Sequence, residues 1–372
     1  MKTELTECDI MDFIGTVRHY KNIVNDNLKA FLDKELDKID DEFLKHNYSA
    51  LKEYVLRDGK RLRPVTTIMA YKAVTDKDEE KIYLPSLAAE LFHASSLIHD
   101  DIMDEDELRR GKESMHNSFK KWFVGQHGET DYQGPIFSKV STRFGVSMAV
   151  MQGNILIALG HLCLSKSNFD SSLINESMGV CNTANIEVNE GQILDILLEA
   201  KNASTEKDYL GMIAKKTGKM FSTSLEIGAV LANATSSQRK ALTDFAMSAA
   251  TTFQIQDDIM DISSSMKKGH EIGSDIKQGK RTLLVIKALE LGDEGQKKVL
   301  FDALGKEEAT KEQIELAIDV LHSTGAVDYA KELALKMIND GKSALAKAEP
   351  ALTEEGLKFF NDFADYMIKR NK

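Results

Sequence analysis

The amino-acid sequence predicts an all-α fold. Only four of its 372 residues are proline, so long uninterrupted helices are permitted. Methionine, with 15 residues, and abundant Ala, Leu, Lys and Glu favour helix over strand. We find no sustained alternation of apolar and polar residues, the pattern that is typical of a half-buried strand.

The apolar spacing divides the chain into successive helices. An amphipathic stretch runs from about residue 9 to 45. Gly59 then supplies a break, and Pro64 suits the first turn of the next helix. Further helices are expected at about 51–56, 65–74, 83–106, 145–164, 173–198, 206–231, 237–262 and from 282 to the C-terminus. Glycines with little apolar periodicity indicate loops at 122–139 and around Gly273 and Gly279.

Composition excludes several classes of function. The net charge of −11 argues against a nucleic-acid-binding surface, so we expect no nucleic-acid partner. Three scattered cysteines without CxxC spacing fit a reducing cytosol and no zinc site. The first residues do not resemble a targeting segment, and no apolar run approaches the length of a membrane span. We therefore expect a soluble, cytoplasmic protein without a transmembrane segment.

One short motif, Asp-Asp-Ile-Met-Asp, occurs twice. In a helix its first and last aspartates share one face, which pairs Asp100 with Asp104 and Asp257 with Asp261. Runs of carboxylates usually mark a solvated helix face. Here both copies follow apolar segments, and like charges held this close repel each other. Bound cations would relieve that repulsion, so the pattern favours a metal site.

Three basic clusters accompany the carboxylates. Arg109 and Arg110 follow the first motif, GKRLRP begins at Gly59, and GSDIKQGK begins at Gly273 after the second motif. The two arginines could simply neutralise the neighbouring acids. Alternatively, guanidinium groups and helix N-termini could bind phosphate oxygens beside the metal. Together the clusters predict a site for phosphates and a divalent metal.

From about residue 59 to 288 the chain resembles the trans-isoprenyl diphosphate synthases. The ordered motifs that carry this resemblance are GKRLRP, LIHDDIMDEDELRRGK, GQILD, KKTGKMF, FQIQDDIMD and GSDIKQGK. The family implies a single-domain bundle of antiparallel helices around a deep central cavity, which usually forms a homodimer. It also implies an enzyme, a prenyltransferase that condenses isopentenyl diphosphate with an allylic diphosphate.

The resemblance assigns roles by position. It implies that Asp100, Asp104, Asp257 and Asp261 hold three Mg²⁺ ions, for which Mn²⁺ could substitute, while Asp101 and Asp258 act behind them. All-oxygen ligation fits Mg²⁺. The residues matched to the allylic diphosphate are Arg109, Lys216, Thr217, Gln254 and Lys280. Those matched to isopentenyl diphosphate are Lys60, Arg63, His93 and Arg110. Catalysis is expected to rest on Asp100, Asp104, Arg109, Lys216, Asp257 and Lys280.

For His93 and for the GQILD motif, a purely structural role is the alternative to a role in the site. A histidine within an apolar segment is more often a core residue, but His93 lies two helical turns before Asp100 and shares its face. Gln192 and Asp195 of the GQILD motif could line the cavity or equally form a hydrogen bond between packed helices.

Product length depends on the residues before Asp100. In this family bulky side chains one turn upstream stop chain growth early, and here those positions are Ser95 and Ser96, with Phe92 a further turn away. We expect all-trans geranylgeranyl diphosphate or a somewhat longer polyprenyl diphosphate. The alternatives are a farnesyl diphosphate synthase, a terpene cyclase or head-to-head condensing enzyme, and a non-catalytic partner subunit of a two-component synthase. Two intact aspartate motifs argue against the partner subunit.

One departure of the chain from related chains is an insertion. An inserted loop is expected at about 118–142, within a single domain that spans residues 1–372. Its Trp122 is expected to pack within the loop, although a lid or a partner surface is the alternative.

Overall fold

The computed structural model describes residues 7–200, 204–263 and 272–369. By its internal contacts the chain divides into two compact units. The N-terminal unit comprises Ile14–Tyr71 and Lys77–Met178, and the C-terminal unit comprises Met1–Phe13, Lys72–Asp76 and Gly179–Lys372. A single domain over the whole chain therefore stays a prediction.

The all-α prediction is confirmed. The elements of the first half are α1 (Glu7–Leu36), α2 (Glu42–Leu56), α3 (Leu62–Val74), α4 (Glu80–Met103), β1 (Leu108–Arg109), β2 (Lys112–Glu113), α5 (Met115–His127) and α6 (Val140–Ser165). Those of the second half are α7 (Ser171–Ala200), α8 (Glu206–Ile213), the π-helical turn η1 (Ala214–Gly218), α9 (Lys219–Leu231), α10 (Ser236–Asp261), α11 (Ser274–Gln278), α12 (Leu283–Leu291), α13 (Glu294–Ala303), α14 (Lys311–Ser323), α15 (Ala326–Leu345) and α16 (Glu354–Lys369). Among the described residues the sheet is limited to the antiparallel pair β1 and β2.

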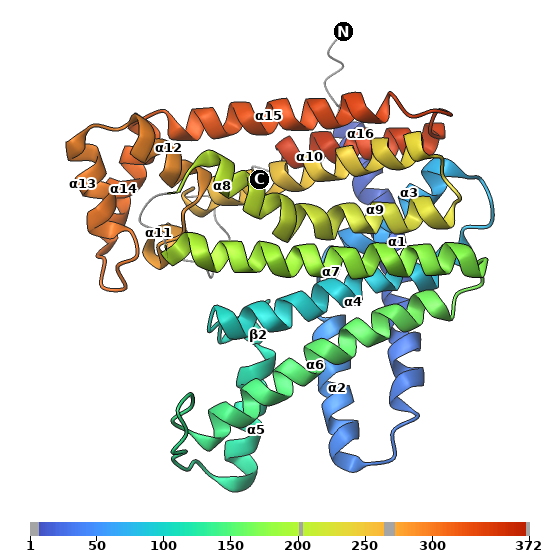
Figure 1. The fold of residues 1–372 in the computed structure, drawn as a ribbon, viewed down its shortest axis with the longest axis horizontal. Coiled ribbons are helices and arrows are strands. Elements are labelled where there is room, and N and C mark those ends of the chain that lie inside the picture. Colours follow the sequence, from blue (N-terminus) through green and yellow to red (C-terminus); the bar gives the residue numbers. More distant parts are fainter. Residues whose placement is uncertain (1–6, 201–203, 264–271, 370–372) are drawn as a thin grey trace. The chain divides into compact units, whose positions relative to one another are not determined.

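In the N-terminal unit, α4 packs along α6, and α6 packs along α5 (Figure 1). Glycines on α6 permit the close approach of α4. Gly153 lies against the ring of His99, and Gly160 lies against the ring of Phe92, so a β-carbon at either position would meet that ring. This packing fixes α4, and with it the first aspartate motif at the end of that helix.

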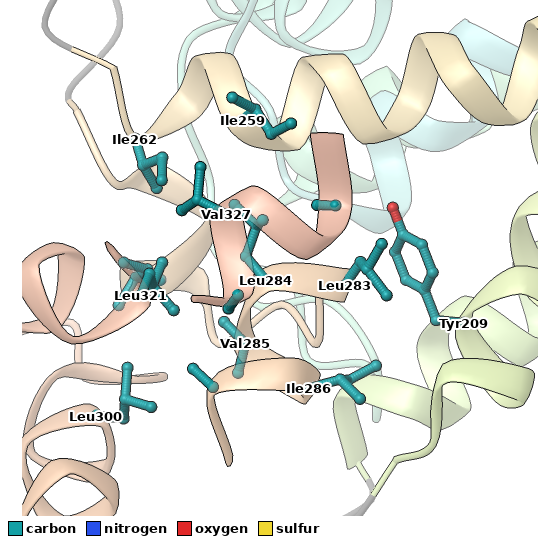
Figure 2. Packing of buried hydrophobic residues seen from close by; sticks show 14 of the residues in the cluster. Tyr209, Ile259, Ile262, Leu283, Leu284, Val285, Ile286, Leu300, Leu321 and Val327 are labelled. Carbon is teal, nitrogen blue, oxygen red and sulfur yellow. The ribbon is translucent and has the colours of Figure 1, made fainter. Parts of the chain in front are cut away.

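In the C-terminal unit, α10 packs along α15 and α9. A cluster of buried apolar side chains from α10, α12, α14 and α15 forms a core there (Figure 2). Leu283 and Leu284 are fully buried in it, and each contributes roughly 1.5–3 kcal/mol by leaving water. Thr205 and Thr235 begin α8 and α10 with reciprocal capping boxes, which satisfy free N–H groups of the first turns. The core and the caps fix the helix that carries the second motif.

The first expected helix is interrupted. Instead of one helix over 9–45, α1 ends at Leu36 and α2 begins at Glu42. Asp41 provides the reason, because its side chain accepts a 2.8 Å hydrogen bond from the backbone N–H of Leu44 and so starts a new helix.

The expected inserted loop is shorter than the sequence indicated. Helix α5 continues to His127, and α6 begins at Val140, so the irregular part covers 128–139. The ring of Trp122 stacks on His46 and Phe144, at centroid distances of 5.4 and 5.8 Å. This aromatic packing holds α5 against α2 and α6, and it agrees with the packing role expected for Trp122.

Helix α6 qualifies the expectation that no segment could span a membrane. Val140–Ser165 is long and apolar enough by length and composition, although the core helix of a soluble protein passes the same test. Only 39% of its most apolar window is buried, and Met151 is 53% exposed. The helix therefore presents apolar surface to its surroundings.

Candidate functional site

The N-terminal unit contains a basic pocket at the side of α4 that carries the first aspartate motif. The pocket measures about 270 Å³, including the space open to solvent. It is lined by Tyr54, Val55, Arg57, Glu90, His93, Ala94, Leu97, Arg109 and Arg110. His93 and Arg110, two of the residues expected to hold isopentenyl diphosphate, thus share one pocket. Lys60, a third, is exposed at the turn that precedes α3.

The charges of this pocket are unbalanced. Among the described residues that line the pocket, Glu90 is the one acidic residue. Arg61 already donates a 2.5 Å hydrogen bond to it. The Nε of Arg63 is buried without a hydrogen-bond partner. Burial lowers the pKa of His93 well below its usual value, and Arg63 and Arg110 lower it further, so the imidazole is neutral near pH 7. Such a pocket favours an anion.

The GKRLRP turn is built around Arg61, a residue that the sequence did not single out. Its backbone adopts a positive φ of 51°. The side chain compensates for this conformation because it binds Asn25, Glu90 and the carbonyl of Arg57. Gly59, in the same turn, leaves room for the guanidinium of Arg110, which a β-carbon would meet at 2.8 Å. The turn thereby places Arg110 beside His93.

The aspartates of the first motif differ in burial. Asp101 is fully buried and accepts hydrogen bonds from Tyr54 Oη at 3.1 Å and Arg109 Nε at 2.6 Å. Arg109 also binds Asp106, at 2.8 Å. Asp100 and Asp104 are at least partly accessible. Of the two interpretations of the adjacent arginines, neutralisation of the acids therefore describes Arg109 in this structure, whereas Arg110 lies over Gly59.

A second pocket, of about 590 Å³ including the space open to solvent, lies in the C-terminal unit. Its lining residues come from α7, α8, η1, α10, α11 and the segment before α12. They are Asp195, Leu198, Tyr209, Met212, Ile213, Lys216, Thr217, Gln254, Asp258, Asp275, Lys280, Arg281 and Thr282. Four of the residues expected to hold the allylic diphosphate, Lys216, Thr217, Gln254 and Lys280, are thus brought together.

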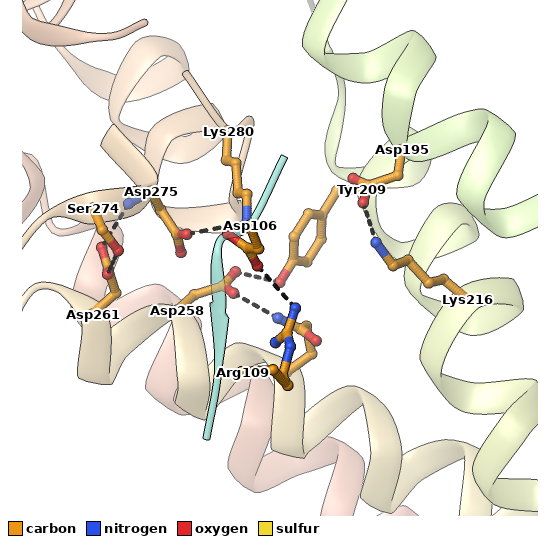
Figure 3. A network of polar contacts seen from close by, with 11 residues as sticks. Asp106, Arg109, Asp195, Tyr209, Lys216, Asp258, Asp261, Ser274, Asp275 and Lys280 are labelled. Atoms are coloured by element: carbon orange, nitrogen blue, oxygen red, sulfur yellow. Dashed lines mark hydrogen bonds and ion pairs between the residues drawn. The ribbon is translucent and has the colours of Figure 1, made fainter. Parts of the chain in front are cut away.

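The π-helical turn η1 presents Lys216 and Thr217 to this pocket. Gly191 on α7 makes room for η1, since a β-carbon there would meet the backbone N of Lys216 at 2.3 Å. Asp195, one turn further along α7, receives the ammonium group of Lys216 at 2.6 Å (Figure 3). Single π-helical turns are frequent at functional sites. Of the two roles left open for Asp195, the structure combines both, since it lines the pocket and bonds across helices.

Asp258, the second aspartate of the second motif, is buried like Asp101. Its Oδ2 accepts a 2.5 Å hydrogen bond from the hydroxyl of Tyr209, and its Oδ1 accepts one from Gln254 at 3.1 Å (Figure 3). Burial raises the pKa of Asp258 to about 7, although the hydrogen bond from Tyr209 opposes the shift. Both second aspartates are therefore held by a tyrosine from another helix.

Asp261 shapes the loop that follows the second motif. Its carboxylate accepts hydrogen bonds from Ser274 Oγ at 2.6 Å and from the backbone N–H of Asp275 at 3.1 Å (Figure 3). Asp275 in turn lies 3.6 Å from the ammonium group of Lys280. Asp257 is half-buried, whereas Asp261 is 5% exposed. The carboxylate of Asp261 is thus already engaged within the protein.

The carboxylates of each motif are the oxygen ligands that a hard divalent cation prefers. Within the described part of the chain, no three His, Cys, Asp or Glu side chains gather as a metal site. Mg²⁺ tolerates this, because it is commonly held by one or two carboxylates together with water and substrate phosphates. The accessible residues Asp100, Asp104 and Asp257 have the required oxygen donors.

The expected chain-length residues lie along α4. Phe92 is 8% exposed, and its ring meets the ring of His161 edge-on at 5.1 Å. Ser95 is buried, and Ser96 is half-buried and donates a hydrogen bond to the carbonyl of His93. The two positions one turn before Asp100 thus carry small, largely buried side chains, as the sequence predicts for a site that leaves room for a growing product chain.

Sequence reasoning missed Tyr54, Tyr209, Asp275 and Arg281. Arg281 stands directly beside Lys280, and Tyr209 stands two helical turns before Lys216. Those spacings were signals that could have been used. No comparable signal connects Tyr54 with Asp101, because their contact joins two separate helices.

Comparison with known proteins agrees with this arrangement. The family model described as "Polyprenyl synthetase" matches residues 45–321. A geranylgeranyl pyrophosphate synthase of Geoglobus acetivorans is 34% identical over 94% of this chain and 98% of its own length. A short chain isoprenyl diphosphate synthase of Methanocaldococcus jannaschii is 36% identical over 85% of this chain and 86% of its own. The crystal structure of geranylgeranyl pyrophosphate synthetase from Pyrococcus horikoshii covers 97% of this chain and 99% of its own, with 28% identity and a TM-score of 0.81. The chain therefore belongs to the polyprenyl synthetase family, the trans-isoprenyl diphosphate synthases, and is a prenyltransferase.

Proposed function

We propose that this prenyltransferase condenses isopentenyl diphosphate with an allylic diphosphate to give all-trans geranylgeranyl diphosphate or a somewhat longer product. The observation that carries the proposal is the presence of two separate polar pockets, each beside one aspartate motif. A terpene cyclase needs no pocket for isopentenyl diphosphate, and a non-catalytic subunit needs neither. The relatives named above support a short-chain product.

Each pocket suits one substrate. The pocket of His93 and Arg110 would hold isopentenyl diphosphate, and the nearby Arg63 adds a second cation that lacks a partner for its Nε. The pocket of Lys216, Thr217, Gln254 and Lys280 would hold the allylic diphosphate. Arg109 lines the pocket of His93 and Arg110 and is now bound to Asp101 and Asp106. It remains a proposed ligand of the allylic diphosphate, for which it would exchange a carboxylate for phosphate oxygens.

The reaction follows from the charges that these residues supply. The allylic C–O bond breaks, and both its electrons leave with the diphosphate, whose developing charge Lys216 and Lys280 stabilise. The double bond of isopentenyl diphosphate then bonds to the allylic cation. A proton is lost from the adduct, and the released diphosphate accepts it. The apolar surroundings exclude water that would otherwise capture the cation.

The metal ligands that we propose are Asp100 and Asp104 in the first motif and Asp257 in the second. Three bound Mg²⁺ ions, or Mn²⁺ in their place, would neutralise charge on the departing diphosphate. Asp261, the fourth expected ligand, would support this site chiefly by holding the loop of Ser274 and Lys280, since its carboxylate accepts two hydrogen bonds.

We further propose a cytoplasmic homodimer in which the two units act as one domain. The exposed apolar surface of α6 supports the dimer, because a face with Met151 half exposed gains by being covered.

The decisive experiment is incubation of purified protein with isopentenyl diphosphate, farnesyl diphosphate and Mg²⁺, followed by chromatographic sizing of the products. We expect elongation to twenty carbons or slightly beyond, and none when EDTA removes the metal. Geranyl diphosphate as primer tests the alternative of a farnesyl diphosphate synthase, for which products would stop at fifteen carbons. A folded preparation that elongates nothing would contradict the proposal and favour the partner-subunit alternative.

A further inference from the structure

Arg281 is a pocket residue to which neither the motifs nor the proposed mechanism assigns a role. It follows Lys280 directly and lines the pocket in the C-terminal unit. Its Nε and Nη1 are both shielded from solvent, and neither has a hydrogen-bond partner in the structure. A guanidinium carries its charge on these groups, so leaving two of them buried without acceptors is costly.

The other charged residues of this pocket have partners. Lys216 binds Asp195 at 2.6 Å, Lys280 lies 3.6 Å from Asp275, and Asp258 accepts hydrogen bonds from Tyr209 and Gln254. Burial lowers the pKa of Arg281, and among the described residues no carboxylate offsets that shift. Among the described lining residues, Arg281 is thus the cation with buried donors that lack an acceptor.

The backbone on both sides of Arg281 is fixed. The N–H of Lys280 donates to the carbonyl of Asp275 at 2.9 Å, and Thr282 caps α12 by accepting a hydrogen bond from Val285. Arg281 is therefore held between the end of a tight loop and the start of a buried helix. The backbone at Arg281 therefore needs little further ordering when the side chain binds a ligand.

We infer that Arg281 is a further substrate-binding residue, whose guanidinium group donates to diphosphate oxygens of the allylic substrate. The planar guanidinium holds several N–H donors at fixed positions in one plane, whereas each neighbouring lysine offers a single ammonium group. This inference rests on the proposed function, since it assumes that the pocket receives the allylic diphosphate.

The test compares Arg281→Gln and Arg281→Lys with the wild type in steady-state kinetics, varying one substrate while the other is saturating. Loss of a charged, buried contact predicts that Arg281→Gln raises KM for the allylic diphosphate by about 10- to 100-fold, with KM for isopentenyl diphosphate unchanged. Arg281→Lys keeps the charge but not the planar set of donors, so its KM for the allylic diphosphate should lie between those of the wild type and Arg281→Gln. Arg18→Gln, at an exposed arginine of α1, is the matched control.

A second readout needs no turnover. Inorganic diphosphate with Mg²⁺ should raise the melting temperature of the wild type more than that of Arg281→Gln. An unchanged KM for the allylic substrate, an equal rise in both KM values, or a loss of melting temperature without any change in KM would each overturn the inference. The wild type could instead elongate nothing, while diphosphate still raises the melting temperature of Arg281→Gln less than that of the wild type. In that case the proposed function fails and the diphosphate site stands.

Discussion

The hydroxyl of Tyr209 donates a 2.5 Å hydrogen bond to Oδ2 of the buried Asp258. The same relationship occurs in the other unit, where Tyr54 donates to the buried Asp101 at 3.1 Å. In each aspartate motif the second carboxylate is therefore turned into the protein and bound by a tyrosine. Because neighbouring residues on a helix point in different directions, this anchor directs the first aspartate of each motif outward, and Asp100 and Asp257 are both partly accessible.

Replacing Tyr209 with Phe should weaken the metal site without touching a proposed ligand. The buried carboxylate of Asp258 would lose its donor, which should lower the free energy of unfolding by about 1–3 kcal/mol. The freed Asp258 would also no longer fix Asp257, so the Mg²⁺ concentration for half-maximal activity should rise by about tenfold or more. Urea denaturation and activity at varied Mg²⁺ measure the two effects.

Tyr329→Phe is the matched control. Tyr329 also donates to a carboxylate, that of Glu206, but it does not line the pocket. It should leave the Mg²⁺ requirement as in the wild type. A Tyr209→Phe enzyme with a normal Mg²⁺ requirement would show that Asp258 does not orient the metal ligands.

The charged residues of the candidate site could be predicted because they occur in short motifs along the sequence. The two aspartate motifs and the lysines of η1 and of the loop after α10 are local patterns, and the second pocket brings Lys216 and Lys280 together as expected. The tyrosine anchors could not be found in this way, since Tyr54 and Asp101 meet only through the packing of α2 against the end of α4. Spacing along the chain does not report such contacts.

The helix boundaries, too, could be predicted where a local pattern sets them but not where tertiary packing does. The apolar periodicity predicts helix through 206–231 correctly, but it does not reveal η1, because one extra residue in a turn leaves the periodicity almost unchanged. Glycines at 125 and 128 suggested a loop from Trp122 onward, yet the stacking of Trp122 on Phe144 stabilises the helix to His127. Tertiary packing outweighs local propensity at both places.

Asparagine substitutions should separate the two outer aspartates of the second motif. Asp257→Asn removes a proposed ligand and should lower kcat by on the order of 100- to 1,000-fold. Asp261→Asn keeps one oxygen that can accept from Ser274, so its loss should be much smaller and should appear mainly in KM for the allylic diphosphate.

Ser274→Ala provides the test of that second role, because it removes one hydrogen bond to Asp261 while leaving every carboxylate in place. It should reproduce the effect of Asp261→Asn on KM. If Asp261→Asn were as damaging to kcat as Asp257→Asn while Ser274→Ala was silent, Asp261 would be a metal ligand and the loop-holding role would be rejected.

The free energy of unfolding should decrease as the pH falls, because His93 is buried in its neutral form. Its pKa in the folded protein lies well below 6.5, because burial and the nearby arginines disfavour the charged imidazole. Below about pH 6.5 the unfolded chain therefore binds a proton that the folded chain does not. This group should reduce the free energy of unfolding by up to about 1.4 kcal/mol per pH unit, until the pH reaches the folded pKa.

Denaturant titrations between about pH 7 and pH 5 measure this slope, and His93→Gln should make it shallower. His322→Gln, at an exposed histidine of α14, controls for loss of an imidazole elsewhere. An equally steep slope in His93→Gln would mean that other groups account for the acid sensitivity.

The proposed dimer should depend on the exposed face of α6. Met151→Asp places a charge where an apolar contact is expected, and burying an unpaired charge is unfavourable, so the variant should be monomeric in light scattering. Leu316→Asp changes a side chain of similar exposure, 49%, on α14 and should leave the dimer intact. A dimeric Met151→Asp, or a wild type that is already monomeric, would exclude this face.

Product length should respond in opposite directions to two substitutions on α4. Ser95 is 2% exposed, so Ser95→Phe must fill space beside the growing chain and should shift products toward fifteen carbons, at a cost in stability of about 1–3 kcal/mol from overpacking. Phe92→Ala removes the ring that packs on His161 and should lengthen the products. Ser96→Ala, which adds no bulk, should leave the profile as in the wild type. Chromatographic sizing of products from all three variants measures this, and since a barrier acts by occupying space, an unchanged profile in Ser95→Phe would place the end of the product chain elsewhere.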